Sequence, residues 1–330
     1  MTSVEASLAV AEAAEALGFW GVSVEDHLLA HRLDCATPVP HQGRGFLESL
    51  QMLAFIAGRT RRVKLLTGVL QLPYRHPVLL AKETMTLDNI SGGRLIVGVG
   101  VGALRRRQQA EGVDLSAYAA IANREYDAVG VTGNRGHITD EYIEALTAIW
   151  TDESASYHGT YVNFDGIDMY PRTVQQPRPP IWVGGRSEAA LRRVAYLADG
   201  WYPSQTSAAF LRTGRARIEE LAAESGRPIA EFGPQNEMYL LRDDAKAHEM
   251  MRRHHRWQFV SDEAMFEQTF TGEPARVIDQ VLAQREAGAT FIDLRPLGVS
   301  LEDTLAQLRL FAEEVMPAIG EPASGATAAS

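Results

Sequence analysis

The 330-residue chain has a single cysteine, Cys35. One thiol cannot form an internal disulfide, so a disulfide-stapled scaffold is excluded, and such sparing use of cysteine is typical of a reducing compartment. The chain also lacks an apolar run long enough to span a bilayer, and its N-terminus lacks a signal-peptide pattern. We therefore expect a cytoplasmic protein without a membrane partner.

Positive charge is scarce as well, with 32 Lys and Arg against 42 Asp and Glu and a net charge of −10. Basic residues gather only in short runs, at 59–62 and 105–107. Without a basic stripe, nucleic acid is not an expected partner. No nucleophile-elbow or Ser-His-Asp signature is found. His254 and His255 lie in a charged stretch without carboxylates at metal-ligand spacing, which predicts solvated side chains and no metal site.

Hydrophobic residues make up 45% of the chain, enough for one large core. Short strand patterns alternate with helical ones almost from end to end, which predicts a parallel sheet with helices outside it. Several strands are apolar throughout, as expected when both faces are covered. The predicted strands cover residues 20–24, 63–70, 94–100, 181–184, 200–203, 237–241 and 290–295. The predicted helices cover 4–17, a face around 46–53, 77–90, 140–150, 187–197, 208–224, 274–287 and 301–315.

This length and pattern favour a single (β/α)8 TIM barrel over residues 1–319, with an open doubly wound sheet as the alternative fold. Only seven barrel strands are predicted, because the chain begins in a helix where a first strand would normally precede it. Residues 157–170 predict an inserted hairpin. Residues 320–330 are small and polar and predict a disordered tail.

The first candidate site follows the first predicted strand, at Glu25-Asp26-His27. Polar groups directly after a buried strand lie where an α/β barrel carries its chemistry. A histidine with an ordinary pKa near ~6.5 can give or take a proton at neutral pH. The alternative is a strand-end histidine that merely hydrogen-bonds a loop carbonyl.

Glycines mark two further strand ends. Gly68-Val69 ends the second predicted strand, and a glycine there indicates a bulge, a close approach to a ligand, or simple packing. Gly98-Val-Gly100-Val-Gly102-Ala103 matches a dinucleotide-binding fingerprint. No acidic residue ends a following strand about 20 residues later, as that fold requires. In a barrel, the same glycines let the strand end approach a cofactor closely.

A phosphate cradle is the fourth candidate, at Gly184-Gly185-Arg186-Ser187 before a predicted helix. Free N–H groups and the helix dipole attract a phosphate, and Ser187 suits the N-cap while Arg186 offers charge-assisted hydrogen bonds. The alternative is an ordinary capped turn. His76 precedes Pro77 at another helix start and is interpreted as structural.

Taken in order along the chain, several motifs resemble the bacterial luciferase-like superfamily of flavin- and deazaflavin-dependent oxidoreductases. The resemblance runs from the first helix to about residue 319. It rests on Leu17-Gly-Phe-Trp20 leading to Glu25-Asp26-His27, Leu72-Pro-Tyr-Arg-His-Pro77, Leu87-Asp-Asn-Ile-Ser-Gly-Gly-Arg-Leu95, Gly98-Val-Gly-Val-Gly102, Thr139-Asp-Glu-Tyr142, Pro180-Ile-Trp-Val-Gly-Gly185 and Arg295-Pro-Leu-Gly298.

The resemblance implies a luciferase-like barrel that binds coenzyme F420 or FMN at the C-terminal ends of its strands. By the same match, Asp26 would contact the ring and support His27, the proton-handling residue. Gly68 and Val69 would form a cis bulge behind the ring. Gly100 and Gly102 would lie along the cofactor's ribityl chain, and residues 184–187 would hold its phosphate. A homodimer packed through the early helices is also implied.

This match predicts an F420-dependent oxidoreductase that passes a hydride between deazaflavin C5 and a small organic substrate. The alternatives are an FMN-dependent monooxygenase and a catalytically silent cofactor-binding protein. Departures from the family pattern include Val101 and Ala103 within the glycine run, which argue against a sugar-phosphate substrate. Residues 106–113 are echoed by 123–131, and this enlarged loop is expected to form a lid or a substrate wall.

Overall fold

The computed structural model describes residues 3–29, 46–102, 123–254, 257 and 260–320. Cys35, His255, the first copy of the loop echo and the predicted tail from residue 321 lie outside these ranges. The strands, in chain order, are β1 (Gly21–Val24), β2 (Lys64–Thr67), β3 (Leu70–Gln71), β4 (Leu95–Gly100), β5 (Ala155–His158), β6 (Asn163–Ile167), β7 (Ile181–Val183), β8 (Gly200–Trp201), β9 (Glu231–Phe232), β10 (Gln235–Leu240), β11 (Thr269–Gly272) and β12 (Asp293–Pro296).

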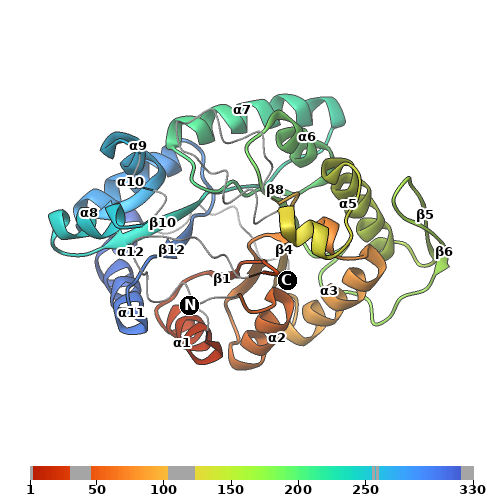
Figure 1. The fold of residues 1–330 in the computed structure, drawn as a ribbon, viewed down its shortest axis with the longest axis horizontal. Helices are drawn as coiled ribbons and strands as arrows, with labels where there is room; N and C mark the ends of the chain where they lie inside the picture. The colour runs from red at the N-terminus through yellow and green to blue at the C-terminus, as the bar shows by residue number, and fades with distance from the viewer. Residues whose placement is uncertain (1–2, 30–45, 103–122, 255–256, 258–259, 321–330) are drawn as a thin grey trace.

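The helices surround these strands (Figure 1). In chain order they are α1 (Val4–Ala16), α2 (Ser49–Arg59), the 3-10 turn η1 (Leu72–Tyr74), α3 (Pro77–Ser91), α5 (Arg135–Thr151), α6 (Glu188–Leu197), α7 (Ala208–Ser225), α8 (Asp244–Arg252), α9 (Asp262–Gln268), α10 (Pro274–Glu286), α11 (Leu301–Leu310), the π-helical turn η3 (Phe311–Val315) and α12 (Met316–Ile319). Within the described part of the chain, no helix is long and apolar enough to cross a membrane.

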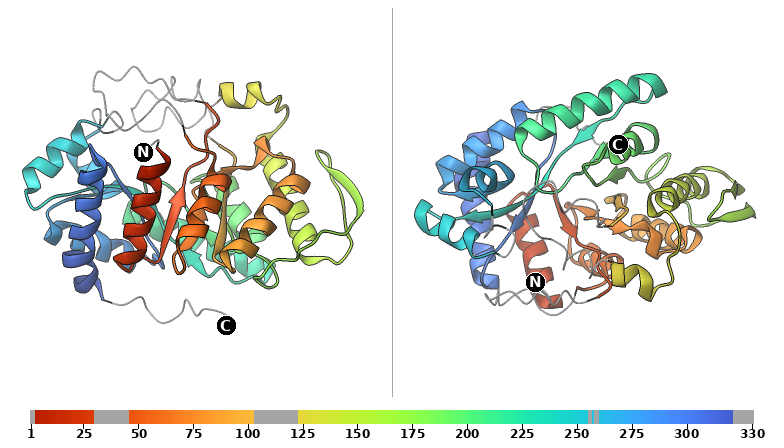
Figure 2. Two further views of the ribbon diagram at one scale, coloured as in Figure 1. Left: turned by 90° about the horizontal axis from the view of Figure 1, so that it is seen from below. Right: turned by 45° about the horizontal axis from the view of Figure 1, so that its top comes forward.

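The strands form a curled parallel wall of the TIM-barrel type, so the predicted fold class is confirmed. Their order is β1-β2-β4-β7-β8-β9, with every neighbour parallel. The wall continues from β9 into β10, because Gln235 bridges to Ser204 just after β8. β12 then pairs with the other edge of β10. Helices from α1 to α7 cover the outside of this wall in chain order (Figures 1 and 2).

Local sequence signals explain where the elements begin and end. α3 starts with Pro77 at its first position and His76 as N-cap, and it ends at Gly92, which adopts φ +67°. Proline is pre-organised for a helix start and glycine tolerates the left-handed C-cap, so both boundaries follow from covalent chemistry. The helix start at Pro77, directly after His76, is thus confirmed. Ser187 likewise caps α6, where its side chain accepts a hydrogen bond from the Ala190 N–H.

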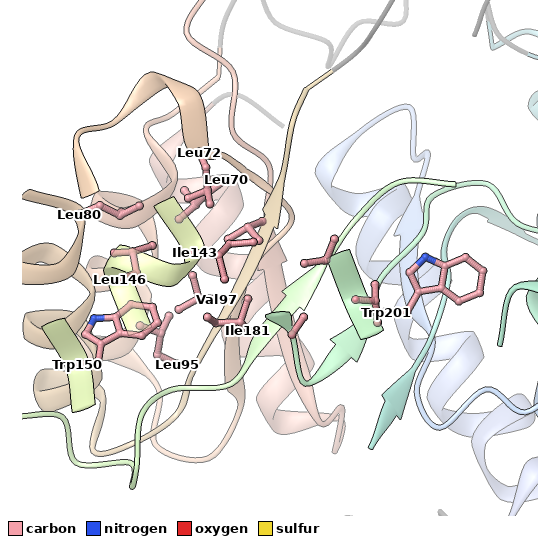
Figure 3. Packing of buried hydrophobic residues seen from close by; sticks show 14 of the residues in the cluster. Leu70, Leu72, Leu80, Leu95, Val97, Ile143, Leu146, Trp150, Ile181 and Trp201 are labelled. Atoms are coloured by element: carbon pink, nitrogen blue, oxygen red, sulfur yellow. The ribbon is translucent and has the colours of Figure 1, made fainter. Parts of the chain in front are cut away.

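The largest apolar cluster lies between the outer face of the sheet and helices α3 and α5 (Figure 3). All six residues of β4 are buried, as the uninterrupted apolar pattern predicted. Trp150 and Leu146 of α5 point at Leu95 and Val97 of β4, and all four side chains are at most 1% exposed. Each such side chain stabilises the fold by about 1.5–3 kcal/mol relative to exposure in water. This packing fixes the strand whose end carries Gly100 and Gly102.

The wall is open along one seam, between β1 and β12. No backbone pairing joins these strands within the described ranges. Every residue of both strands is partly exposed, in contrast to β4. Side chains bridge the seam instead: Ser23 Oγ donates to Asp293 Oδ2 at 2.8 Å, and Arg295 forms a bidentate ion pair with Glu25 at 2.8 and 3.0 Å. These side-chain contacts connect the two edges of the wall in place of a backbone ladder.

Every predicted strand overlaps an observed one, but two strands were missed. β9 and β11 are short. In β11, Thr269 and Thr271 interrupt the apolar pattern that would predict a buried strand. Both threonines are buried because their hydroxyls bond to each other at 2.8 Å. The antiparallel pair of β5 and β6 confirms the hairpin, which projects beyond α5 (Figure 1).

The prediction of a solvated His254 was wrong. The charged stretch forms helix α8 and a following turn, in which the His254 N–H donates to the Met251 carbonyl at 3.0 Å. The side chain of His254 is folded inward, and only 4% of the residue is exposed. Arginines on both sides of a histidine therefore did not predict its exposure.

Candidate functional site

The ends of β2, β4 and β7 meet around the side chain of Val69. The Gly68–Val69 peptide bond is cis, as the family resemblance implied. A Cβ added to Gly100 would lie 2.9 Å from Val69 Cγ2, and one added to Gly184 would lie 3.4 Å from Val69 Cγ1. Side chains at Gly100 and Gly184 would therefore crowd Val69. These four residues form one shallow cradle, which we call the glycine cradle, at the C-terminal rim of the sheet.

Gly102 connects the glycine cradle to a polar group on the same rim. It adopts φ +72°, and a Cβ there would collide with the Tyr126 hydroxyl. That hydroxyl donates to Gln71 Oε1 at 2.7 Å and lies 2.9 Å from the Val101 carbonyl. Glycine is required here both for the positive φ and for the close approach of Tyr126.

His27 lies on this rim and contacts a buried carboxylate. Its Nδ1 is 3.3 Å from Glu125 Oε2 and 3.4 Å from Gln71 Nε2. The imidazole is 17% exposed, whereas the Glu125 side chain is fully buried. Glu125 Oε1 also accepts the Leu28 and Leu29 N–H groups at 2.8 and 2.9 Å, so it fixes the backbone that follows His27.

The surroundings of Glu125 keep it ionised. Burial alone would raise the pKa of this carboxyl, but hydrogen bonds from His27, the Leu29 N–H and the Tyr74 hydroxyl lower it to about 2. The Tyr74 hydroxyl donates to Oε2 at 2.8 Å, and burial together with this carboxylate raises the pKa of Tyr74. An ionised acceptor at Nδ1 favours a proton on that nitrogen and orients the imidazole ring.

Asp26 has a different set of partners. Arg75 donates to both of its oxygens, at 2.6 and 2.7 Å, and the Gln71 N–H donates to Oδ2 at 2.9 Å. Asp26 is 4% exposed. The carboxylate that meets His27 is therefore Glu125, whereas Asp26 anchors Arg75 below the rim. Direct contact between Asp26 and a cofactor ring stays a prediction.

The Gly-Gly-Arg-Ser turn lies at the N-terminus of α6, directly after the cradle residue Gly184. Gly185 adopts φ +103°, which a side chain would strain. Arg186 stacks over the Phe210 ring with its guanidinium carbon 4.5 Å from the centroid, and it donates to the Gln205 carbonyl at 3.0 Å. The first N–H groups of a helix have no intrahelical partners, so this turn can receive an anion.

All ten sequence-predicted site residues thus lie along one rim, linked through Gln71, Gly102 and Val69. Sequence reasoning missed the residues that support His27, namely Gln71, Tyr74, Arg75, Glu125 and Tyr126. Glu125 lies in a helical segment, 123–128, within the second copy of the loop echo. The echo was a usable signal, because the second copy places Glu125 and Tyr126 where the first copy has Arg107 and Gln108.

Comparison with protein families gives one match over most of the chain. The model of the luciferase-like monooxygenase family covers residues 2–258. A protein of Mycobacterium tuberculosis without a described activity is 30% identical over 237 residues, which is 69% of this chain and 75% of that protein. The FMNH2-dependent dimethylsulfone monooxygenase of Pseudomonas putida is 28% identical over 182 residues, 55% of this chain and 46% of that enzyme. The F420-dependent glucose-6-phosphate dehydrogenase of Nakamurella multipartita is 28% identical over 232 residues, 69% of this chain and 61% of that enzyme.

Solved structures agree with the fold. The monooxygenase RslO1 from Streptomyces bottropensis superposes with a TM-score of 0.77 at 27% identity, over 95% of this chain and 93% of that one. The F420-dependent tetrahydromethanopterin reductase from Methanopyrus kandleri gives a TM-score of 0.76 at 19% identity, over 96% of each chain. F420-dependent and FMN-dependent enzymes therefore both occur among the similar proteins.

Proposed function

Since the chain belongs to the luciferase-like monooxygenase family, whose characterised relatives are oxidoreductases, we propose that it uses coenzyme F420 to transfer a hydride to or from a small organic substrate. The observation that carries this proposal is the shared rim. His27, held by Glu125, lies along the same strand ends as the glycine cradle and the α6 turn. This arrangement supports proton transfer beside an anchored cofactor.

The residues present fit such a cofactor. Gly68, Gly100 and Gly184 surround Val69 and carry no side chains of their own, so a flat ring system would meet no side chain from these three positions. The α6 N-terminus offers N–H groups and a positive dipole to a phosphate, and Arg186 adds a charge beside it. Anchoring both ends of the cofactor fixes the distance and angle of its reactive carbon.

Bound F420 supplies a carbon atom that accepts or gives a hydride. The protein must then manage the accompanying proton. In the oxidation of an alcohol, His27 would accept the O–H proton of the substrate. In the reverse direction, His27 would return that proton to the oxygen. Glu125 stabilises the doubly protonated imidazolium through Nδ1 in both directions.

A second candidate is an FMN-dependent monooxygenase on the same barrel. It is favoured by the similarity to RslO1 and to the dimethylsulfone monooxygenase. In that case, the glycine cradle and the α6 turn have the same anchoring role. A protein that binds cofactor without catalytic activity is the third alternative.

One binding experiment separates these functions. The purified protein is titrated with F420 and, separately, with FMN, and binding is followed by cofactor fluorescence. Tight binding of F420 with reduction of a carbonyl in a substrate panel supports the proposal. Preference for FMN with oxygen consumption supports the monooxygenase. Binding without turnover supports the silent protein, and binding of neither cofactor contradicts all three.

Replacing His27 tests its proton-handling role. His27→Ala is expected to leave F420 affinity within a few-fold and to lower turnover by ~10²–10⁴, the usual contribution of a general acid or base. His76→Ala is the control, because His76 is exposed at the start of α3 and its side chain makes no capping bond. Unchanged turnover of the His27 variant would remove this residue from the mechanism.

Replacing Arg186 tests the phosphate anchor. Arg186→Ala is expected to weaken F420 binding by ~1.5–3 kcal/mol, the range for a charge-assisted hydrogen bond. Arg192→Ala is the matched control on the same helix, since Arg192 is half exposed and pairs with Glu188 at 3.2 Å. Equal affinity of both variants would place the phosphate elsewhere. We also propose that the protein is cytoplasmic and forms a homodimer packed through the early helices. Light scattering would measure the mass of this dimer.

A further inference from the structure

Four polar side chains from different strands meet inside the curved wall, and the proposed mechanism uses none of them. Asp293 of β12 is at the centre. Its Oδ2 accepts from Ser23 Oγ at 2.8 Å, from Gln235 Nε2 at 3.2 Å and from the Tyr202 hydroxyl. Gln235 Nε2 also lies 3.1 Å from that hydroxyl. We call these four residues the Asp293 cluster.

The Asp293 cluster adjoins the glycine cradle. A Cβ added to Gly68 would lie 3.0 Å from the Tyr202 hydroxyl, 3.3 Å from Ser23 Cβ and 3.5 Å from Gln235 Nε2. The cis peptide between Gly68 and Val69 is therefore in direct contact with the groups that hold Asp293. A molecule resting on the cradle at Gly68 would therefore lie next to the side chains that bind Asp293.

The two carboxyl oxygens of Asp293 differ in how many hydrogen bonds they accept. Three donors converge on Oδ2, which saturates its capacity as an acceptor. Within the described part of the chain, no donor meets Oδ1, and Asp293 is partly accessible. When the carboxyl group is neutral, its proton must therefore lie on Oδ1, the oxygen left for a ligand.

The charges nearby favour this neutral form. Burial raises the pKa of Asp293, hydrogen bonds from Tyr202, Ser23 and Gln235 lower it in part, and the Glu25 carboxylate raises it again. Glu25 is neutralised in turn by Arg295, across the seam. Tyr202 is itself buried, and the resulting rise in its pKa keeps its hydroxyl protonated and donating. The net direction is upward, so Asp293 can act as a hydrogen-bond donor.

From this arrangement we propose that neutral Asp293 donates a hydrogen bond from Oδ1 to a carbonyl oxygen of the pyrimidine ring that F420 and FMN share. This inference rests on the proposed function, because it takes the glycine cradle as the seat of the ring. It assigns Asp293 a binding role that does not depend on which of the two cofactors is used. No bond to carbon is made or broken in this contact.

The dependence of cofactor affinity on pH tests the assignment. The wild-type protein is expected to bind F420 more weakly as the pH rises through the pKa of Asp293, because the donor proton is lost. Asp293→Asn mimics the neutral acid, with one acceptor oxygen and one N–H donor, and is expected to retain affinity without this pH dependence. Asp293→Ala is expected to bind about tenfold more weakly than Asp293→Asn at every pH. Any titration of F420 itself remains in the Asn variant, which therefore serves as the reference curve.

Two milder variants move the midpoint in opposite directions. Ser23→Ala removes a hydrogen bond that lowers the pKa of Asp293, so the midpoint of the affinity curve is expected to rise by about 0.5–1 unit. Glu25→Gln removes a repulsive charge, so the midpoint is expected to fall. Glu144→Gln is the control, since Glu144 of α5 accepts from the Tyr157 hydroxyl of β5 at 2.6 Å, and the hairpin of β5 and β6 projects beyond α5 (Figure 1).

The outcomes separate this inference from the proposed function. If the wild-type protein binds neither F420 nor FMN, the proposed function fails and the inference fails with it. If the wild type binds and the Asn variant shows an identical pH dependence, Asp293 does not contact the ring, although the proposed function stands. An affinity that rises with pH would show that an ionised Asp293 accepts a ring N–H, and would equally overturn the assignment. An unfolded Asp293→Ala protein leaves the Ser23 and Glu25 variants to decide.

Discussion

The buried ion pair between Asp26 and Arg75 gives a direct test of how the rim is held together. Arg75→Met removes the guanidinium and keeps much of the apolar stem. The side chain of Asp26 is 2% exposed and that of Arg75 is 13% exposed, so the carboxylate would be left without its cationic partner in a water-poor environment. Breaking a buried pair on one side typically costs about 3–5 kcal/mol.

The remaining contacts of Asp26 determine how much of the ~3–5 kcal/mol range Arg75→Met is expected to lose. After the substitution, the carboxylate still accepts from the Gln71 N–H at 2.9 Å and from Ser49 Oγ at 3.4 Å. Two short charge-assisted bonds, at 2.6 and 2.7 Å, are lost. Arg75 also bonds Glu48 at 2.8 Å, but Glu48 is partly exposed and regains water. We therefore expect Arg75→Met to lower the free energy of unfolding by about 3 kcal/mol, near the lower end of the range.

Urea unfolding of four proteins measures this value. Arg75→Met and Asp26→Asn are compared with the double variant and the wild type, and the double variant is expected to lose less than the sum of the single losses. Arg217→Met is the control, because Arg217 and its partner Glu188 are exposed and such pairs are worth about 0–1 kcal/mol. A loss below about 1 kcal/mol for Arg75→Met would refute the view that Asp26 is an ionised anchor.

Two further predictions concern stability. Gly98→Ala places a Cβ against the Thr67 carbonyl oxygen and should lower the free energy of unfolding by ~2–4 kcal/mol in thermal denaturation. Gly58→Ala is the control, because Gly58 lies in open space on α2, and it should raise the free energy of unfolding by ~0.5–1 kcal/mol. Equal effects of the two substitutions would contradict the close packing of β2 and β4. The pKa of Glu125 falls from 4.5 to about 2 on folding, so its contribution is present above pH 4.5 and is lost as the pH falls toward 2. The stability difference between wild type and Glu125→Gln should therefore shrink by up to about 3 kcal/mol over this interval in acid titrations of unfolding, and a constant difference would show that Glu125 titrates normally.

The fold was predictable because its signals are local. The apolar run of β4, the Pro77 start of α3 and its Gly92 end each follow from a few neighbouring residues. β11 was missed because its threonines are satisfied by each other, and that pairing exists only after folding. His254 was misjudged for a similar reason, since its burial depends on what packs over the turn after α8.

The site was predictable only in part. Motif order placed His27, the glycines and the α6 turn on one rim, because these residues follow directly after strands. Their partners come from far along the chain: Glu125 is 98 residues from His27, and Asp293 is 270 residues from Ser23. Nothing in the sequence specifies such pairings. An acidic residue within a predicted strand, as at Asp293, was the available sign of a polar group inside the wall.

One carboxylate joins two segments that could otherwise diverge independently. Oε1 of Glu125 accepts hydrogen bonds from the backbone N–H groups of Leu28 and Leu29, and Oε2 contacts the imidazole of His27. Any exchange of the 123–128 segment, whether by natural drift or by loop grafting to alter substrate choice, would also remove the carboxylate that contacts the imidazole. New specificities on this scaffold are therefore constrained to retain an acid at this position, or to find another counter-charge for the histidine.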